Sequence, residues 1–73
     1  MKISVGDIIG LNGEISGHTV IGTGWNYRTR KFIDLSDGRC VPVSDVYVVR
    51  TDNGDGTATE IFSDGRVRTV ELE

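Results

Sequence analysis

Residues 31–49 read KFIDLSDGRCVPVSDVYVV, and this stretch decides the fold. Asp37 and Gly38 separate two apolar-rich runs, and both residue types accept the positive φ angles of a two-residue hairpin loop. A loop of that length predicts a hairpin in which Ser36 lies opposite Arg39. The same register places Leu35, Ile33 and Phe32 opposite Cys40, Pro42 and Val43.

The second strand of this hairpin is expected to be short. Pro42 has no backbone N–H to donate to a ladder, so its strand should end there or run along a sheet edge. Ser44 and Asp45 then turn the chain into an apolar run over residues 46–49. Strand, Asp-Gly turn, strand, corner and strand is a pattern that favours a small β-barrel.

The chain before this hairpin also has β character. The protein has ten glycines and one proline, and no window repeats apolar residues at the spacing of an amphipathic helix. Strands are predicted over residues 5–11 and 19–27. Gly22 and Gly24 interrupt the second of these and predict a bulge or a sharp bend.

A second hairpin is predicted at the C-terminus, with strands over residues 57–62 and 66–72. Its turn reads Ser-Asp-Gly-Arg and repeats residues 36–39, which favours two Asp-Gly turns over two copies of a binding loop. In the register of a two-residue loop, one face is shared by Ile61, Arg68, Val70 and Leu72.

We expect one domain over residues 1–73: a barrel core over 1–50, a Gly- and Asp-rich loop over 51–56 and a hairpin over 57–73. Seventy-three residues are close to the lower limit for a self-sufficient core, and only 37% of them are hydrophobic. A homo-oligomer is therefore expected, in which the C-terminal hairpin extends the barrel or pairs with a neighbouring subunit.

Composition also restricts the cellular location and the chemistry. Cys40 is the single cysteine, which excludes an internal disulfide, and with His18 it is too little for a structural zinc site. No secretion signal is visible, and no segment approaches the roughly 20 apolar residues of a membrane helix. We predict a cytoplasmic protein without a membrane partner. The net charge of −3 argues against a protein that coats nucleic acid through charge alone.

No catalytic, metal or cofactor site is predicted. Residues 53–56 look like the middle of an EF-hand loop, but its first and twelfth positions would be Thr51 and Phe62, which supply no carboxylate. His18 has no recognisable nucleophile or acid partner, and it is expected on a loop or strand surface. Cys40 is expected to be a small apolar residue in the barrel wall.

Residues 5–7 (Val-Gly-Asp), 24–27 (Gly-Trp-Asn-Tyr) and 32–49 together resemble small SH3-like barrels. In that family a Gly-Asp corner opens the first strand, an aromatic strand follows, and an Asp-Gly hairpin leads through a short turn into the last strand. The resemblance covers about the first fifty residues. It implies an all-β, roughly five-stranded barrel, here with an added C-terminal hairpin, and it says little about function.

One enzyme family of this fold class provides an alternative. Type II dihydrofolate reductases are tetrameric SH3-like barrels with a central pore built around a Val-Gln-Ile-Tyr run. The corresponding residues 40–43 read Cys-Val-Pro-Val in this chain. Because that run is absent, this activity is the least favoured interpretation.

One cluster of residues favours a binding site. Three basic residues follow directly after two aromatic ones: Trp25, Tyr27, Arg28, Arg30 and Lys31. Strand alternation places Trp25 and Tyr27 on one face, and aromatic rings beside cations suit stacked bases, phosphates or acidic peptide segments. The alternative is that Trp25 fills the core and the basic residues only solubilise a loop.

Three functions follow in order of preference. The first is a non-catalytic SH3-like module that binds another protein, in the style of short phage or mobile-element accessory proteins. An acidic surface that mimics nucleic acid could then be the working face; its residues would be Asp52, Asp55, Glu60, Asp64, Glu71 and Glu73. The second is nucleic-acid or nucleotide binding through the aromatic and basic cluster, with an oligomeric sponge for small nucleotides as a special case. The third is a small oligomeric enzyme.

Overall fold

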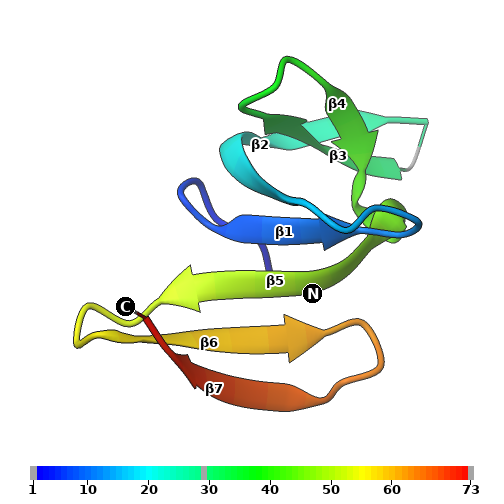
Figure 1. Cartoon of the computed structure of the whole chain (residues 1–73). Helices are drawn as coiled ribbons and strands as arrows, with labels where there is room; N and C mark the ends of the chain where they lie inside the picture. Colours follow the sequence, from blue (N-terminus) through cyan, green and yellow to red (C-terminus); the bar gives the residue numbers. More distant parts are fainter. Residues whose placement is uncertain (1, 29, 73) are drawn as a thin grey trace.

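The computed structural model describes residues 2–28 and 30–72. Its elements are β1 (Ile8–Leu11), β2 (Gly17–Tyr27), β3 (Arg30–Leu35), β4 (Cys40–Pro42), the 3-10 turn η1 (Val43–Asp45), β5 (Val46–Asp52), β6 (Thr57–Phe62) and β7 (Val67–Glu71). The seven strands form one antiparallel sheet in the order β4-β3-β2-β1-β5-β6-β7 (Figure 1). The all-β class is confirmed. Over the described residues the sheet stays open, with β4 and β7 as its edges, so it is not a closed five-stranded barrel.

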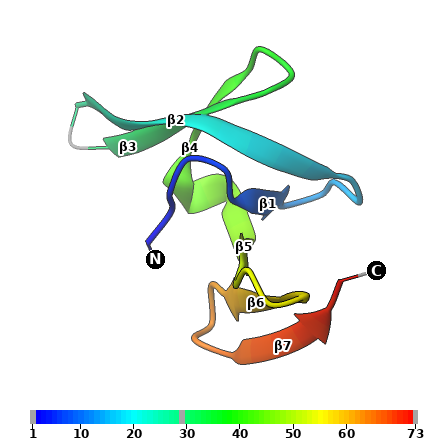
Figure 2. The same cartoon turned by 90° about the vertical axis from the view of Figure 1, so that its left-hand side faces the viewer.

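Strand β2 folds the sheet over itself. Its first residues pair with β1, and its remainder, from Val20 to Tyr27, pairs with β3. The β2–β3 register shifts on both sides of Gly22, where a bulge was predicted. Bulges bend a strand and increase its twist. The strands β2, β3 and β4 therefore form a layer that lies over β1 and β5 (Figure 2).

The core between these layers is entirely aliphatic. Its buried residues are Ile9, Leu11, Val20, Ile33, Leu35, Val46 and Val49. All five aromatic residues of the chain lie in the described part, and none of them is buried. Trp25 is 58% exposed. The alternative in which Trp25 fills the core is therefore wrong.

The hairpin between β3 and β4 has the predicted turn but a different register. The backbone N–H of Gly38 donates to Leu35 O and that of Leu35 donates to Arg39 O, at 3.0 and 2.8 Å. Ser36, Asp37 and Gly38 thus form a three-residue loop, in which Gly38 has a φ of 92°. A turn closed by a glycine at this third position adds one residue to the loop. Asp34, rather than Leu35, consequently pairs with Cys40.

The C-terminal hairpin repeats this geometry. Gly65 has a φ of 91°, and its N–H donates to Phe62 O. The register again differs by one residue, which transfers side chains to the other face. Ile61 lies opposite Val67, whereas Glu60 lies opposite Arg68 and Ala58 opposite Val70. The prediction that Ile61 shares a face with Arg68 and Val70 is therefore wrong.

Other element boundaries differ less. β1 begins at Ile8 rather than at residue 5, and β5 continues through Asp52, so the following loop comprises residues 53–56. β4 is an edge strand that ends at Pro42, and η1 turns the chain into β5, as predicted. No helix within residues 2–28 and 30–72 has the length and apolarity needed to cross a membrane. The cytoplasmic location stays a prediction.

Candidate binding face on strands β2, β3 and β4

The pairing of β2, β3 and β4 places a row of large side chains on one side of the sheet. Trp25 pairs with Phe32, which pairs in turn with Pro42, and Tyr27 pairs with Arg30. Paired residues on neighbouring strands point to the same face. We call these five residues the outer aromatic face. Trp25 is 58% and Tyr27 63% exposed, while Phe32 and Pro42 are half-buried.

The indole of Trp25 is held in place on this face. Its Nε1–H donates to Asp34 Oδ2 at 2.5 Å. Gly22 pairs with Asp34, and a Cβ atom at residue 22 would lie 2.8 Å from the same oxygen. The missing side chain of Gly22 therefore gives the Asp34 carboxylate room to reach the indole. A hydrogen-bonded ring loses less conformational freedom on binding than a free one.

Cationic groups lie at the tip of the β2–β3 hairpin. Arg28 has a φ of 49°, and its guanidinium carbon lies 5.4 Å from the centroid of the Tyr27 ring. Arg30 lies directly across from Tyr27. Lys31 is different, because it pairs with Asn26 on the opposite side of the sheet. The structure thus brings Trp25, Tyr27, Arg28 and Arg30 together but separates Lys31 from them.

The distribution of ion pairs leaves this end of the molecule positively charged. The other four arginines each form a salt bridge with a carboxylate; they are Arg39, Arg50, Arg66 and Arg68. Over residues 2–28 and 30–72, Lys2, Arg30 and Lys31 form none. Exposed cations without a carboxylate partner keep their full field, so Arg30 and Lys31 leave the tip of the β2–β3 hairpin locally positive.

The acidic residues of the C-terminal hairpin mainly serve the fold. Glu60 is buried between Arg50 and Arg68, and both guanidinium groups donate to its carboxylate. Hydrogen bonds from Arg68, and then those from Arg50, hold the pKa of Glu60 below its usual value. Asp64 pairs with Arg66. The proposed acidic surface thereby loses Glu60, and Glu73 lies outside the described residues.

The two Ser-Asp-Gly-Arg sequences have the same structural role. In each copy, Asp Oδ1 accepts the backbone N–H of the following arginine, and Oδ2 accepts its Nε–H. The aspartates are Asp37 and Asp64. Their hydrogen bonds close the turn locally, which supports the interpretation of the repeat as two turns.

His18 belongs to a polar cluster that the sequence did not reveal. Its Nε2 lies 3.0 Å from Glu14 Oε1, and its Nδ1 lies 3.5 Å from Asp37 Oδ2. Arg39 donates to both carboxylates, and hydrogen bonds from Arg39 lower the pKa of Glu14 and of Asp37. His18 lies about twenty residues from Asp37 in the chain, and no motif links them.

This cluster fastens the loop after β1 to the loop after β3. No hydroxyl or thiol group of the described residues is hydrogen-bonded to His18, so the cluster has no nucleophile–base pair. No group of three or more His, Cys, Asp or Glu within those residues is arranged to hold a metal ion. Cys40 was expected to be a small apolar residue in the barrel wall, but it is exposed on β4 beside Asp34.

Comparison of the chain with known protein families, with curated proteins and with solved structures gives no match.

Proposed function

We propose that this protein is a non-catalytic, SH3-like binding module that recognises another protein through its outer aromatic face. The observation that carries the proposal is the exposure of Trp25 and Tyr27 on one face of a protein whose core is aliphatic throughout. Trp, Tyr and Arg are the residue types that contribute most to protein–protein interfaces. A small domain that leaves its tryptophan in solvent uses it for something other than stability.

Three features support the SH3-like part of the proposal. β1 pairs with both β2 and β5, β2 is strongly bent, and η1 joins β4 to β5. All seven buried residues of the core cluster come from β1, β2, β3 and β5. The hairpin β6–β7 lies outside this unit and extends the sheet beyond β5.

The chemistry of the face favours a particular kind of partner segment. Phe32 and Pro42 continue the apolar row that Trp25 begins, and Arg28 and Arg30 lie at one end of it. An apolar or aromatic side chain followed by acidic residues would complement both parts. The hydrogen bond from Trp25 to Asp34 preorganises the largest contact.

The experiment is affinity capture from native lysate with three baits: the wild type, Trp25→Ala with Tyr27→Ala, and a control. The control replaces Ile15 by Ser; Ile15 is fully exposed but lies in the loop between β1 and β2, outside the outer aromatic face. We expect at least one protein to be captured by the wild type and by the control but lost with the double variant. If every captured protein binds all three baits equally, the outer aromatic face is not the binding site.

A second candidate function is the binding of short single-stranded nucleic acid. It is favoured by the Arg28 guanidinium over the Tyr27 ring and by Arg30, which no described carboxylate neutralises. Phosphate contacts by these two arginines predict a slope of about −1.4 for log K against log salt. Fluorescence anisotropy with labelled oligothymidylate measures this slope. Replacement of Arg28 and Arg30 by Ala should abolish the binding, and unchanged binding would eliminate this site.

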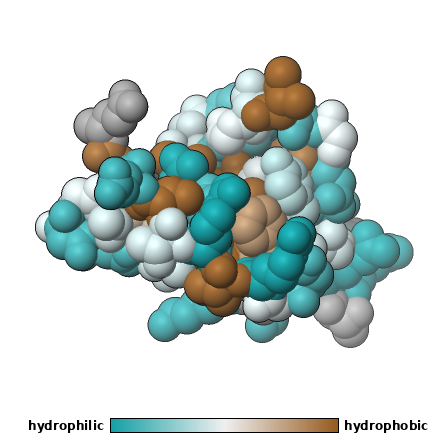
Figure 3. Space-filling model, turned by 60° about the horizontal axis from the view of Figure 1, so that its bottom comes forward, coloured by the Kyte–Doolittle hydropathy of each residue, from teal (hydrophilic) through white to brown (hydrophobic). Residues whose placement is uncertain are grey.

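We also propose that the protein forms a homo-oligomer through β7. β7 is an edge strand, and its Val67 and the neighbouring Ile61 are exposed, at 64% and 39%. Seen from the side of β6 and β7, apolar groups are separated by hydrophilic ones (Figure 3), which favours strand pairing over a broad apolar interface. Native mass spectrometry tests this directly, because a monomer at all concentrations would contradict it.

A further inference from the structure

The two edges of the sheet, β4 and β7, differ in the backbone groups that they offer to another strand. In an antiparallel pair, residues that are hydrogen-bonded to the partner strand alternate with residues whose N–H and C=O groups point away from it. An edge strand therefore presents the groups of every second residue to the outside. The hairpin turns and the registers determine which residues these are.

At the β4 edge, one of the outward positions is a proline. The N–H of Leu35 donates to Arg39 O, so this pair is hydrogen-bonded. Counted from there, Val41 bonds to β3, whereas Cys40 and Pro42 direct their backbone groups outward. Proline has no N–H, so Cys40 is the only outward donor of this three-residue strand. A short strand with a proline is a poor template for further pairing.

At the β7 edge, every outward position has both groups. Hydrogen bonds close the β6–β7 hairpin at both ends, from Phe62 N–H to Arg66 O and from Leu72 N–H to Gly56 O, each at 2.8 Å. Both ends give the same alternation along the register between them. The strand thus directs the N–H and C=O groups of three residues to the outside: Val67, Thr69 and Glu71.

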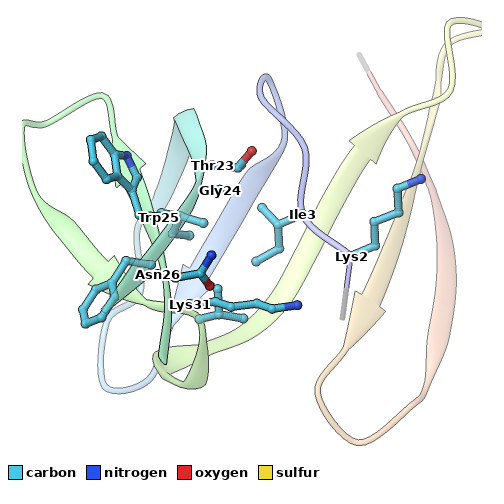
Figure 4. A pocket seen from close by; sticks show the side chains of 10 residues that line it. Lys2, Ile3, Thr23, Gly24, Trp25, Asn26 and Lys31 are labelled. Carbon is cyan, nitrogen blue, oxygen red and sulfur yellow. The ribbon is translucent and has the colours of Figure 1, made fainter. Parts of the chain in front are cut away.

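β7 also lacks the usual protection of a sheet edge. Residues 67–71 read VRTVE, without a proline, a lysine or a bulge in the register. The one cation of the strand, Arg68, donates to Glu60 on β6, so its side chain is directed back across the hairpin. Figure 4 shows β7 as the outermost strand on the side away from Trp25, beyond β5 and β6. This edge is therefore open to a strand from another chain.

A second copy of β7 fits this edge in one register better than in its neighbours. A two-fold axis at Arg68 would set two arginines directly opposite each other, which destabilises a strand pair. An axis at Val70 aligns two hydrogen-bonded pairs within residues 67–71. An axis at Thr69 avoids the arginine pair and aligns three: residue 67 with 71, 69 with 69, and 71 with 67.

We propose that β7 pairs with β7 of a second copy, antiparallel about a two-fold axis at Thr69, and that the product is a closed dimer. This inference rests on the proposed homo-oligomer and adds its copy number and its register. The dimer is closed because the pairing uses both open edges and leaves only the two edges that carry Pro42. The strand order places the two outer aromatic faces at opposite ends of the joint sheet, so one dimer presents two binding faces.

Native mass spectrometry of the full chain over a range of concentrations tests the copy number. The wild type should give monomer and dimer and no larger species. Thr69→Pro removes the outward N–H at the axis and no hydrogen bond within the hairpin, so it should fold, as circular dichroism reports, and dimerise about tenfold more weakly or worse. Trp25→Ala with Tyr27→Ala should dimerise like the wild type, because both side chains lie far from β7.

The outcomes separate this inference from the proposals on which it depends. A monomer at all concentrations contradicts the homo-oligomer and this pairing alike. Species larger than a dimer, or a Thr69→Pro variant that dimerises as tightly as the wild type, contradict this pairing alone. Loss of partner capture with the Trp25 and Tyr27 variant concerns the outer aromatic face, and the dimer should persist in that variant.

Cysteine cross-linking tests the register even if Thr69→Pro does not fold. The background is Cys40→Ser, which removes the exposed native thiol. Thr69→Cys places two thiols at the axis, where paired Cα atoms lie about 5.5 Å apart and a disulfide can form. In Val67→Cys the two thiols are offset by four residues, roughly 13 Å, which is too far. Copper phenanthroline should therefore link Thr69→Cys much faster than Val67→Cys; equal rates, or no link through residue 69, would overturn the proposal.

Discussion

Glu60 offers the sharpest test of how the C-terminal hairpin is held to the rest of the sheet. Its side chain is 8% exposed, and its two oxygens each serve a different arginine. Oε2 accepts from Arg50 at 2.8 and 3.1 Å, and Oε1 accepts from Nε of Arg68 at 2.9 Å. The row Arg50–Glu60–Arg68 therefore runs across β5, β6 and β7.

Replacement of Glu60 by Gln keeps the shape and removes the charge. The amide oxygen can still accept from one arginine, but the NH₂ group then faces the other guanidinium, donor against donor. A hydrogen bond to a charged group is worth about 1.5–3 kcal/mol. Arg50 and Arg68 are 39% and 62% exposed, so water solvates the released guanidinium. The expected loss is therefore near the lower end, about 2 kcal/mol.

Thermal and urea unfolding followed by circular dichroism measure this loss. For a domain of this size, about 2 kcal/mol corresponds to a decrease in Tm of about 8–16 °C. Glu71→Gln is the control, because Glu71 is exposed on β7 and forms no salt bridge with a described residue. It should change the free energy of unfolding by less than about 0.5 kcal/mol.

The pH dependence gives an independent check. The pKa of Glu60 is lowered from 4.5, chiefly by hydrogen bonds from Arg68. A carboxyl group with a lowered pKa in the folded state stabilises fully above its unfolded pKa and loses this contribution as the pH falls through the folded pKa. The difference in the free energy of unfolding between wild type and Glu60→Gln should thus be constant near neutrality and decrease in acid. A difference no larger than that of Glu71→Gln, or one that does not decrease in acid, refutes the reasoning.

Three further predictions concern the turns and the outer aromatic face. Gly65→Ala should destabilise the protein by about 1 kcal/mol or more in urea unfolding, because φ at residue 65 is 91° although an added Cβ meets nothing within 4 Å; no loss would contradict the turn. Gly22→Ala should push the Asp34 carboxylate away from Trp25. The indole N–H should then exchange faster with solvent in NMR, while the free energy of unfolding falls by about 1 kcal/mol or less. Unchanged indole exchange would show that this hydrogen bond does not depend on Gly22. Acrylamide should quench Trp25 fluorescence in the native state almost as well as in the unfolded state, because the side chain is half exposed. Strong protection from quenching in the native state would show that Trp25 is buried.

Much of the candidate site was predictable from local rules. Alternation placed Trp25 and Tyr27 on one face, and the same rule separates Arg30 from Lys31 once both are in a strand. The assignment of the basic residues to the loop after the aromatic strand hid this separation, because β3 begins at Arg30. The cluster of Glu14, His18, Asp37 and Arg39 was not predictable, since it depends on two loops from different hairpins meeting in space.

The sequence by itself determined the β class, the positions of both Asp-Gly turns, the edge position of Pro42 and the bend at Gly22, because each follows from backbone preferences of one or two residues. Tertiary structure alone decided the hairpin registers and the role of the aromatic residues. Register depends on whether the closing glycine is the second or third loop residue, and one step transfers Ile61 to the other face. Exposure of Trp25 depends on which face the other layer covers, and strands β1 and β5 cover the face with Ile33 and Leu35. Their aliphatic side chains complete the core, and the opposite face is left to solvent or to a partner.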